Sequence, residues 1–193
     1  MRPELNEQRP LSVPRAALGV ARSVLRTALL LAQRRIHLPR GHVGEELRFD
    51  DGTAATVYRE SVVDRGPALR PAVLVVRFRL RLVRGRGHAY FRRESILNTP
   101  LFIGFPGFAS KLWLAHDQNG TYRGVYEWDD AARAAKYARS LWRVLQIGCE
   151  PGTIGYRVIP GIRRDELLRD PTLAPGAEGN GWWRLAALET ERV

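Results

Sequence analysis

The sequence contains very little sulfur: one cysteine, Cys149, and one methionine among 193 residues. A lone cysteine excludes an internal disulfide. Together with the absence of a signal-peptide pattern, it predicts a cytoplasmic protein with a buried, inert thiol. Lysine is nearly absent too, since only Lys111 and Lys136 accompany 29 arginines. We attribute the net charge of +11 to this arginine bias and not to selection for phosphate binding.

Several motifs of common enzymes are also missing. The sequence has no G-x-G-x-x-G, H-E-x-x-H or G-x-S-x-G pattern, so dinucleotide binding, zinc proteolysis and α/β-hydrolase chemistry have no support. Gly85-Arg86-Gly87 is a turn and is too short for a phosphate-binding loop. We therefore expect no metal ion and no cofactor.

The central part of the chain predicts an alternation of strands and helices. Strand 72–83 has one apolar face from Val76 onward, and Asn119-Gly120 predicts a tight turn between two strands. Asp129 and Asp130 are suited to cap the helix that follows. The expected elements are a strand at 72–83, a helix at 88–98, two strands within 106–128, a helix at 131–145 and a strand at 153–159.

This βαββαβ order predicts a ferredoxin-like α+β sandwich, in which two helices cover one face of a four-stranded antiparallel sheet. The other face is left to be buried by a partner. Before the sandwich, residues 45–63 predict a further hairpin that turns at Asp51-Gly52 and either extends the sheet or forms a flap. After it, Trp182-Trp183 is expected to dock a tail onto a groove.

The segments Pro106-Gly107-Phe108, Lys111-Leu112-Trp113 and Gly124-Val125-Tyr126, followed by an acid-capped, alanine-rich helix, carry a resemblance. Over roughly residues 71–164 the chain resembles the small mono-oxygenase-like group of the dimeric α+β-barrel superfamily. The resemblance implies a homodimer in which two sheets close face to face into a barrel. It also implies a ligand cavity in the barrel lumen.

The expected organisation has four parts: a basic amphipathic helical extension at 1–40, a hairpin and linker at 41–67, the ferredoxin-like barrel domain at 68–165 and a C-terminal tail at 166–193. Residues 1–40 carry eight arginines against Glu4 and Glu7. Arg22 and Arg26 interrupt the apolar run that a membrane span requires. The helix either docks on the domain, which we prefer, or lies on a membrane surface through residues 15–36.

On the first strand of the sandwich, Arg77, Arg79 and Arg81 alternate with apolar residues. If the helices cover the apolar side, these arginines face the lumen, where they would favour a small anionic or aromatic ligand. Alternatively, Glu127 and other carboxylates neutralise them. By the same alternation Lys111 and Trp113 share a face, and with Tyr126 they are candidates for a pocket wall or for the dimer core.

His116 and Asn98 are the candidate catalytic residues. His116 could act as a general base, although beside Asp117 it is more simply a turn residue. The resemblance implies cofactor-free mono-oxygenase chemistry on a phenol-bearing substrate, with Asn, Trp, Tyr and Arg side chains around it. It does not imply haem, because the helix at 131–145 lacks a histidine.

Three classes of function are therefore open. They are a mono-oxygenase-like enzyme, a non-catalytic ligand-binding or structural dimer, and a peripheral membrane or nucleic-acid binder. We rank this third class last, because no aromatic residues are interleaved with the basic ones of the N-terminal helix.

Overall fold

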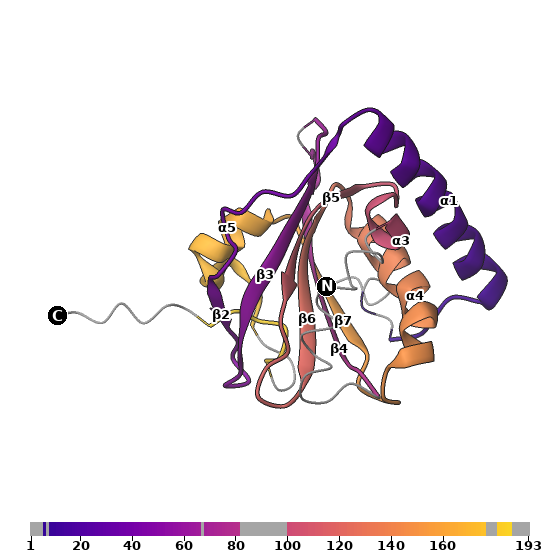
Figure 1. Cartoon of the computed structure of the whole chain (residues 1–193). Helices are drawn as coiled ribbons and strands as arrows, with labels where there is room; N and C mark the ends of the chain where they lie inside the picture. Colours follow the sequence, from indigo (N-terminus) through magenta and orange to yellow (C-terminus); the bar gives the residue numbers. More distant parts are fainter. Residues whose placement is uncertain (1–5, 7, 67, 82–99, 177–180, 187–193) are drawn as a thin grey trace.

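The computed structural model describes residue 6 and residues 8–66, 68–81, 100–176 and 181–186. The helices of this part are α1 (Val13–Ala32), α3 (Pro100–Ile103), α4 (Ala131–Gly148), α5 (Arg164–Arg169) and the 3-10 helix η2 (Pro171–Leu173). The strands are β1 (Ile36–His37), β2 (Glu46–Arg48), β3 (Ala54–Val63), β4 (Ala72–Arg79), β5 (Phe108–Leu114), β6 (Thr121–Trp128) and β7 (Gly155–Pro160). Figure 1 shows the sheet between α1, α3 and α4 on one side and β2 and α5 on the other.

All strand pairs are antiparallel, and the strand order is β1-β3-β5-β6-β4-β7, with β2 paired to β3. The four strands β7-β4-β6-β5 reproduce the order of the ferredoxin-like unit, which confirms the predicted fold class. Because β3 pairs with β5, the predicted hairpin extends the sheet. The helix expected at 88–98 lies outside the described residues.

The local signals in the sequence form the turns and the cap that they predicted. Gly120 and Gly52 both adopt positive φ angles, of 74° and 78°, at the turns between β5 and β6 and between β2 and β3. Asp130 caps α4, since its carboxylate accepts hydrogen bonds from the backbone N–H groups of Ala132 and Arg133 at 2.9 and 3.2 Å.

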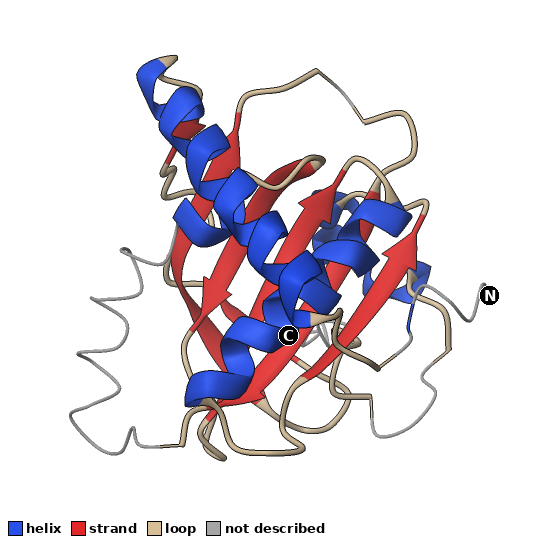
Figure 2. Ribbon diagram, turned by 90° about the vertical axis from the view of Figure 1, so that its right-hand side faces the viewer, coloured by secondary structure: helices blue, strands red, loops and turns tan. Residues whose placement is uncertain are grey.

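We call the side of the sheet that carries α1, α3 and α4 the helix face. Figure 2 shows the helices lying across this side of the sheet. The packed layer is rich in aromatic rings from both strands and helices. Tyr137 of α4, for example, lies against Trp128 with ring centroids 4.7 Å apart.

The opposite face of the sheet is covered by the chain itself. Val73, Val75 and Leu112 point to this side and are fully buried. The covering side chains come from β2 and its turn, α5, η2 and the C-terminal segment 181–186; they are Phe49, Leu167, Ala174, Trp183 and Leu185. The expectation that this face is left for a partner, with a ligand cavity in a barrel lumen, is therefore wrong for this chain. A second sheet could reach it only by displacing these segments.

Gly104, just after α3, is required by the close approach of α1. A Cβ atom at this position would overlap the backbone carbonyl oxygen of Ser23 and lie 2.6 Å from Oγ1 of Thr27, both on α1. We expect Gly104→Ala to lower the free energy of unfolding by about 1–3 kcal/mol, because α1 must move away. The control is Gly41→Ala, where a Cβ meets nothing within 4 Å. Urea unfolding of the two variants checks this; equal midpoints would contradict the close approach.

Candidate functional site: a buried lysine among aromatic rings

Lys111, on β5, points into the helix face and is 5% exposed. Its Nζ lies 3.1 Å from the ring centroid of Trp113, 4.7 Å from that of Tyr126 and 5.3 Å from that of Phe102. We call these four residues the aromatic site. They come from β5, β6 and α3, so the site lies between the sheet and the helix layer.

The pairing of β5 with β6 builds this arrangement. Lys111 stands opposite Tyr126 in the ladder, and Trp113 stands opposite Gly124. A Cβ at Gly124 would lie 2.8 Å from the Tyr126 ring and 3.1 Å from Cε of Lys111. A glycine at this position therefore leaves the space that the lysine stem and the tyrosine ring occupy.

Burial lowers the pKa of Lys111 well below its usual value, and the nearby positive charge of Arg59 lowers it further. Among the hydrogen bonds and ion pairs between residues that the structure describes, none involves its Nζ. The three rings stabilise the ammonium form by cation–π contact, which offsets only part of the desolvation. The lowered pKa means that Lys111 loses its proton closer to physiological pH than an ordinary lysine does. A base or a nucleophile has to be in this neutral form.

Polar groups surround the rings of the site. Trp113 donates its indole N–H to Oγ of Ser61 at 3.0 Å, and the guanidinium of Arg59 lies 4.3 Å from the Trp113 ring centroid. Tyr137 donates its hydroxyl to that of Tyr126 at 3.4 Å. Burial raises the pKa of both tyrosines, so their hydroxyls stay protonated and remain hydrogen-bond donors. The side chains of Lys111 and Arg59 and the hydroxyls of Tyr126 and Tyr137 therefore lie around one cluster of aromatic rings.

The predicted site residues do not all converge. Lys111, Trp113 and Tyr126 come together on the helix face, whereas Arg77 lies on the opposite face, 4.3 Å above the Trp182 ring. Burial lowers the pKa of Arg77, and the charge of Arg123 lowers it further.

Arg79 is paired with a carboxylate, as the alternative predicted, whereas Arg81 and Glu127 have partners other than those expected. Arg79 pairs with Glu150 at 3.5 Å, and the exposed Arg81 donates to the carbonyl of Cys149 at 3.5 Å. Glu127 instead accepts the backbone N–H of Arg164 at 3.0 Å and lies 3.6 Å from Arg163. The expected arginine-lined lumen is therefore not formed.

His116 belongs to the turn between β5 and β6. Its Nδ1 lies 3.0 Å from the backbone oxygen of Asp117, and its ring packs edge-on against Tyr122. It lies outside the aromatic site, so its catalytic assignment gains no support from the geometry. Asn98, the second catalytic candidate, lies outside the described residues.

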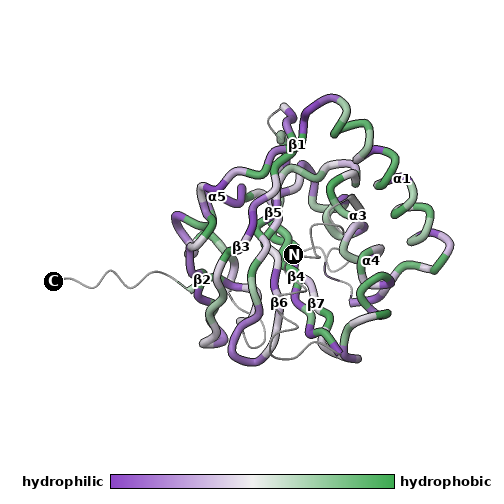
Figure 3. The backbone as a smooth tube through the Cα atoms, viewed as in Figure 1, coloured by the Kyte–Doolittle hydropathy of each residue, from purple (hydrophilic) through white to green (hydrophobic). Residues whose placement is uncertain are grey.

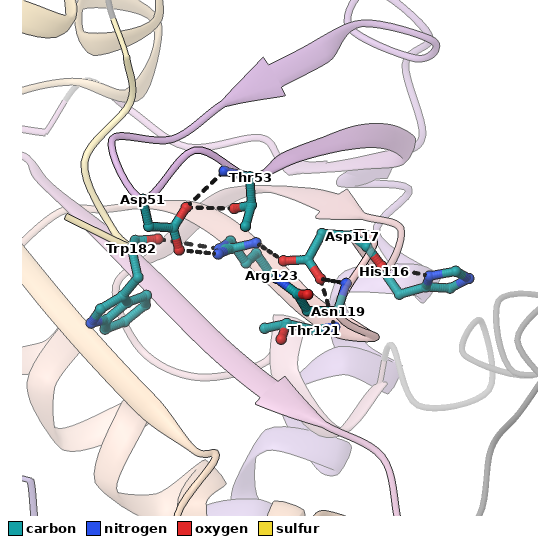
Figure 4. Close-up of polar contacts among 8 residues, drawn as sticks. All are labelled: Asp51, Thr53, His116, Asp117, Asn119, Thr121, Arg123 and Trp182. Atoms are coloured by element: carbon teal, nitrogen blue, oxygen red, sulfur yellow. Dashed lines mark hydrogen bonds and ion pairs between the residues drawn. The ribbon is translucent and has the colours of Figure 1, made fainter. Parts of the chain in front are cut away.

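The buried charge network beside His116 was not predicted (Figure 4). Arg123, on β6, donates to Asp117 at 2.6 Å, to Asp51 at 2.8 Å and to the backbone oxygen of Trp182 at 3.2 Å. Asp117 also accepts the backbone N–H groups of Asn119 and Thr121 at 2.8 and 3.0 Å. The network joins two hairpin turns to the C-terminal segment. The one available signal was a lone arginine within an apolar strand.

A second buried ion pair holds α5 against the sheet. Arg164 donates to Glu60 at 2.7 Å, and both side chains are at least nine-tenths buried. Both residues line a pocket of about 420 Å³, together with His42 and Asp165. Because the carboxylate of Glu60 is neutralised by the arginine, we interpret this group as a structural clamp.

Cys149 is buried, as expected, and burial raises the pKa of its thiol to about 12. A thiol with such a pKa is protonated at neutral pH and is a poor nucleophile. Among the described residues, no three His, Cys, Asp or Glu side chains are grouped closely enough to hold a metal ion.

The comparisons with known proteins concern the fold. No protein-family model matches the chain, and no curated protein matches it. One similar solved structure is an uncharacterized ferredoxin-fold protein from Listeria monocytogenes related to antibiotic biosynthesis mono-oxygenases. It is 14% identical over 58% of this chain and 66% of its own, just under two thirds, with a TM-score of 0.42. Another is a major regulator of staphylococcal pathogenesis, 13% identical over 71% of this chain and 92% of its own, with a TM-score of 0.38. The fold class, ferredoxin-like, rests on the strand order of the chain itself.

Proposed function

We propose that this protein is a mono-oxygenase-like enzyme that oxidises an electron-rich phenol with O₂ and without a cofactor, at the aromatic site. The observation that carries the proposal is the Lys111 amine, which is buried against three rings and has no carboxylate partner among the described residues. Burying a lysine in this way destabilises the fold, and such residues are typical of functional sites.

In the proposed reaction the phenolic O–H gives its proton to the neutral Nζ of Lys111. The resulting ammonium and the guanidinium of Arg59 then stabilise the phenolate. A phenolate is electron-rich enough to reduce O₂ directly: one oxygen atom is added to the ring and the other leaves as water. Naphthol and O₂ would give naphthoquinone and one water molecule, with all electrons supplied by the naphthol. The proton held by Lys111 returns to the departing oxygen.

The rest of the site has a supporting role in this proposal. The rings of Trp113 and Phe102, whose planes are tilted by 50° to each other, provide apolar contacts for an aromatic substrate. The protonated hydroxyl of Tyr126, which accepts the O–H of Tyr137, keeps its own proton and is available to donate a hydrogen bond to the oxygen that accumulates charge. The substrate class is thus a small aromatic molecule that becomes anionic when bound. Homodimerisation stays a prediction, through a surface other than the covered sheet face.

A non-catalytic binding protein is the second candidate. It is favoured by the packing of the opposite sheet face, which is filled by the chain's own side chains where a barrel enzyme would keep a cavity. The two candidates differ in whether a bound phenol is turned over.

The test is aerobic incubation of the full-length protein with naphthol under ¹⁸O₂, followed by mass spectrometry of the product. We expect one labelled oxygen per quinone, and a rate at least about 100-fold lower in Lys111→Met because the general base is gone. Lys136→Met removes the other lysine, which is exposed on α4, and is the matched control. A full rate in Lys111→Met would refute the assignment. Quenching of tryptophan fluorescence by naphthol without turnover would favour the binding protein.

A further inference from the structure

The contact that docks α1 on the domain is made mainly by small and polar residues, with one leucine at the end of the helix. The buried side chains of α1 are Ala16, Ser23, Thr27 and Leu30. Gly19 lies beside them, where a Cβ would be 3.4 Å from the Phe105 ring. The leucine-rich side of the helix is not used in this contact.

The outward side of α1 is apolar and exposed. Six of the ten large apolar side chains that are exposed in the described part of the chain belong to this helix, from 39% for Val24 to 73% for Leu25; they are Val13, Leu18, Val24, Leu25, Leu29 and Leu31. At 3.6 residues per turn they lie within an arc of about 160° that contains only apolar residues and one proline. Figure 3 shows hydrophobic residues along α1 at the outer edge of the molecule. A continuous apolar strip of this kind indicates an interaction surface.

Positive charge borders this strip on one side. Arg15, Arg22 and Arg26 follow it along α1, and no acidic residue occurs between residues 8 and 44. Between α1 and α4 lies a cleft of about 610 Å³, whose charged lining residues are Arg15, Arg22, Lys136 and Arg139. We call it the cationic cleft. Arg139 donates to the backbone oxygen of Arg9.

The other cations of the cleft are not neutralised by the described part of the protein. Arg15, Arg22 and Lys136 form no ion pair with any residue that the structure describes. All three are exposed. They are therefore available to an external anion.

On the other side, the strip continues onto the end of α4. A groove of about 660 Å³ is lined by apolar side chains of α1 and, on α4, by Val144 and Ile147 next to Arg143 and Gln146. Ile147 is 82% exposed. The apolar surface thus extends across two helices and is flanked by a cleft that attracts anions.

We propose that α1 docks this protein on the surface of a membrane that contains anionic phospholipids. The outward leucines and valines enter the boundary between headgroups and acyl chains, and the cationic cleft holds a lipid phosphate. The helix lies in the plane of the surface, because its opposite side is fixed to α3 and α4. None of the described helices combines the length and apolarity needed to cross a membrane.

Charge complementarity favours lipid over a second copy of the chain. A symmetric pair formed through this face would bring the arginines of two α1 helices together, with no acidic residue on either helix to neutralise them. An anionic bilayer supplies the opposite charge. Since α1 carries no Trp or Phe, its insertion depends on this attraction, so neutral membranes should bind the protein poorly.

The experiment is flotation of the full-length protein with vesicles of phosphatidylcholine alone or mixed with phosphatidylglycerol, at low and high salt. We expect binding to the mixed vesicles only, and loss of binding at high salt. Arg15→Gln, Arg22→Gln and Lys136→Gln together should weaken binding about 100-fold, at roughly fivefold per charge. Leu25→Gln with Leu29→Gln should weaken it at least about tenfold.

The matched control is Leu69→Gln with Leu173→Gln, which replaces exposed leucines outside α1. An equal loss in this control, or equal binding to neutral vesicles, would overturn the proposal. A third outcome would also overturn it: the protein does not bind vesicles but forms a dimer, and Leu25→Gln with Leu29→Gln dissociates this dimer. The apolar strip would then be an interface between two copies of the chain. These outcomes do not depend on turnover at Lys111, so this proposal and the proposed function can fail separately.

Discussion

Replacing Arg123 by methionine is expected to lower the free energy of unfolding by about 3–5 kcal/mol. The carboxylates of Asp117 and Asp51 would then remain in the protein interior without a positive partner. Arg123 is 2% exposed, Asp117 is 1% exposed, and the ion pair between them is 2.6 Å long. The variant should also loosen the C-terminal segment, since Arg123 donates to the backbone of Trp182. Urea unfolding measures the first effect. Limited proteolysis and a red shift of tryptophan emission measure the second.

Arg133→Met is the matched control. Arg133 pairs with Asp129 at 2.8 Å, but it is 54% exposed and is one helical turn from its partner. An exposed pair of this kind contributes at most about 0.5 kcal/mol. If both variants lost the same small amount, the network of Arg123 would not be what holds the two hairpin turns and the C-terminal segment together.

The elements that follow from local physical chemistry could be predicted from the sequence. Gly120 and Gly52 allow the positive φ angles of the two hairpin turns, and the carboxylate of Asp130 caps α4. The alternation along β4 correctly places Val76 on the helix face and Arg77 on the opposite face. Each of these depends on residues that are neighbours in the sequence.

The candidate site was only half predictable, because its geometry depends on contacts between distant segments. Alternation correctly placed Lys111 and Trp113 on one face, but it could not relate β5 to β4. A register shift between Phe108 and Ser110 intervenes, and the lysine faces the helices. Trp183 and Leu185 fill the sheet face opposite the helices. No local pattern predicts this, because it depends on where a segment distant in the sequence packs.

The N-terminal helix shows the same limit in another form. Its periodicity correctly predicted a helix, and the preferred alternative, that it docks on the domain, agrees with the structure. Hydrophobicity alone suggests that the leucines make the contact, whereas only Leu30 does so, and Ser23, Thr27 and Gly19 provide most of the rest. The side of α1 with small residues faces the domain because it allows α1 to approach Gly104 and α4 closely. Leu25 and Leu29, on the other side of the helix, are therefore exposed.

Replacing Lys111 by methionine is expected to stabilise the protein at pH 7, by about 1–3 kcal/mol, while it abolishes the proposed activity. Methionine fills a similar volume and makes favourable contacts with the same rings, but it has no charge to desolvate. A gain in stability coupled to a loss of function is the mark of a residue kept for chemistry. A structural lysine would show the opposite, since its removal would weaken packing.

The pH dependence of this gain tests the burial of the amine directly. In the unfolded chain Lys111 has its ordinary pKa, about 10.5, whereas burial lowers that of the folded state. Between the two values the unfolded state binds more protons, so the stability of the wild type rises with pH. The advantage of Lys111→Met should therefore shrink from pH 7 toward pH 9.5. We would stop there, because Tyr126 and Tyr137 keep their protons when folded and reverse the slope above about pH 10.

Urea midpoints at several pH values, with Lys136→Met as the exposed control, measure this change. A difference between Lys111→Met and the wild type that stays constant over the whole range would mean that the folded lysine keeps its proton. In that case the three rings fully compensate for the lost hydration. Lys111 would then be a permanent cation suited to hold an anion, and the proton transfer in the proposed reaction would have to be assigned to another group.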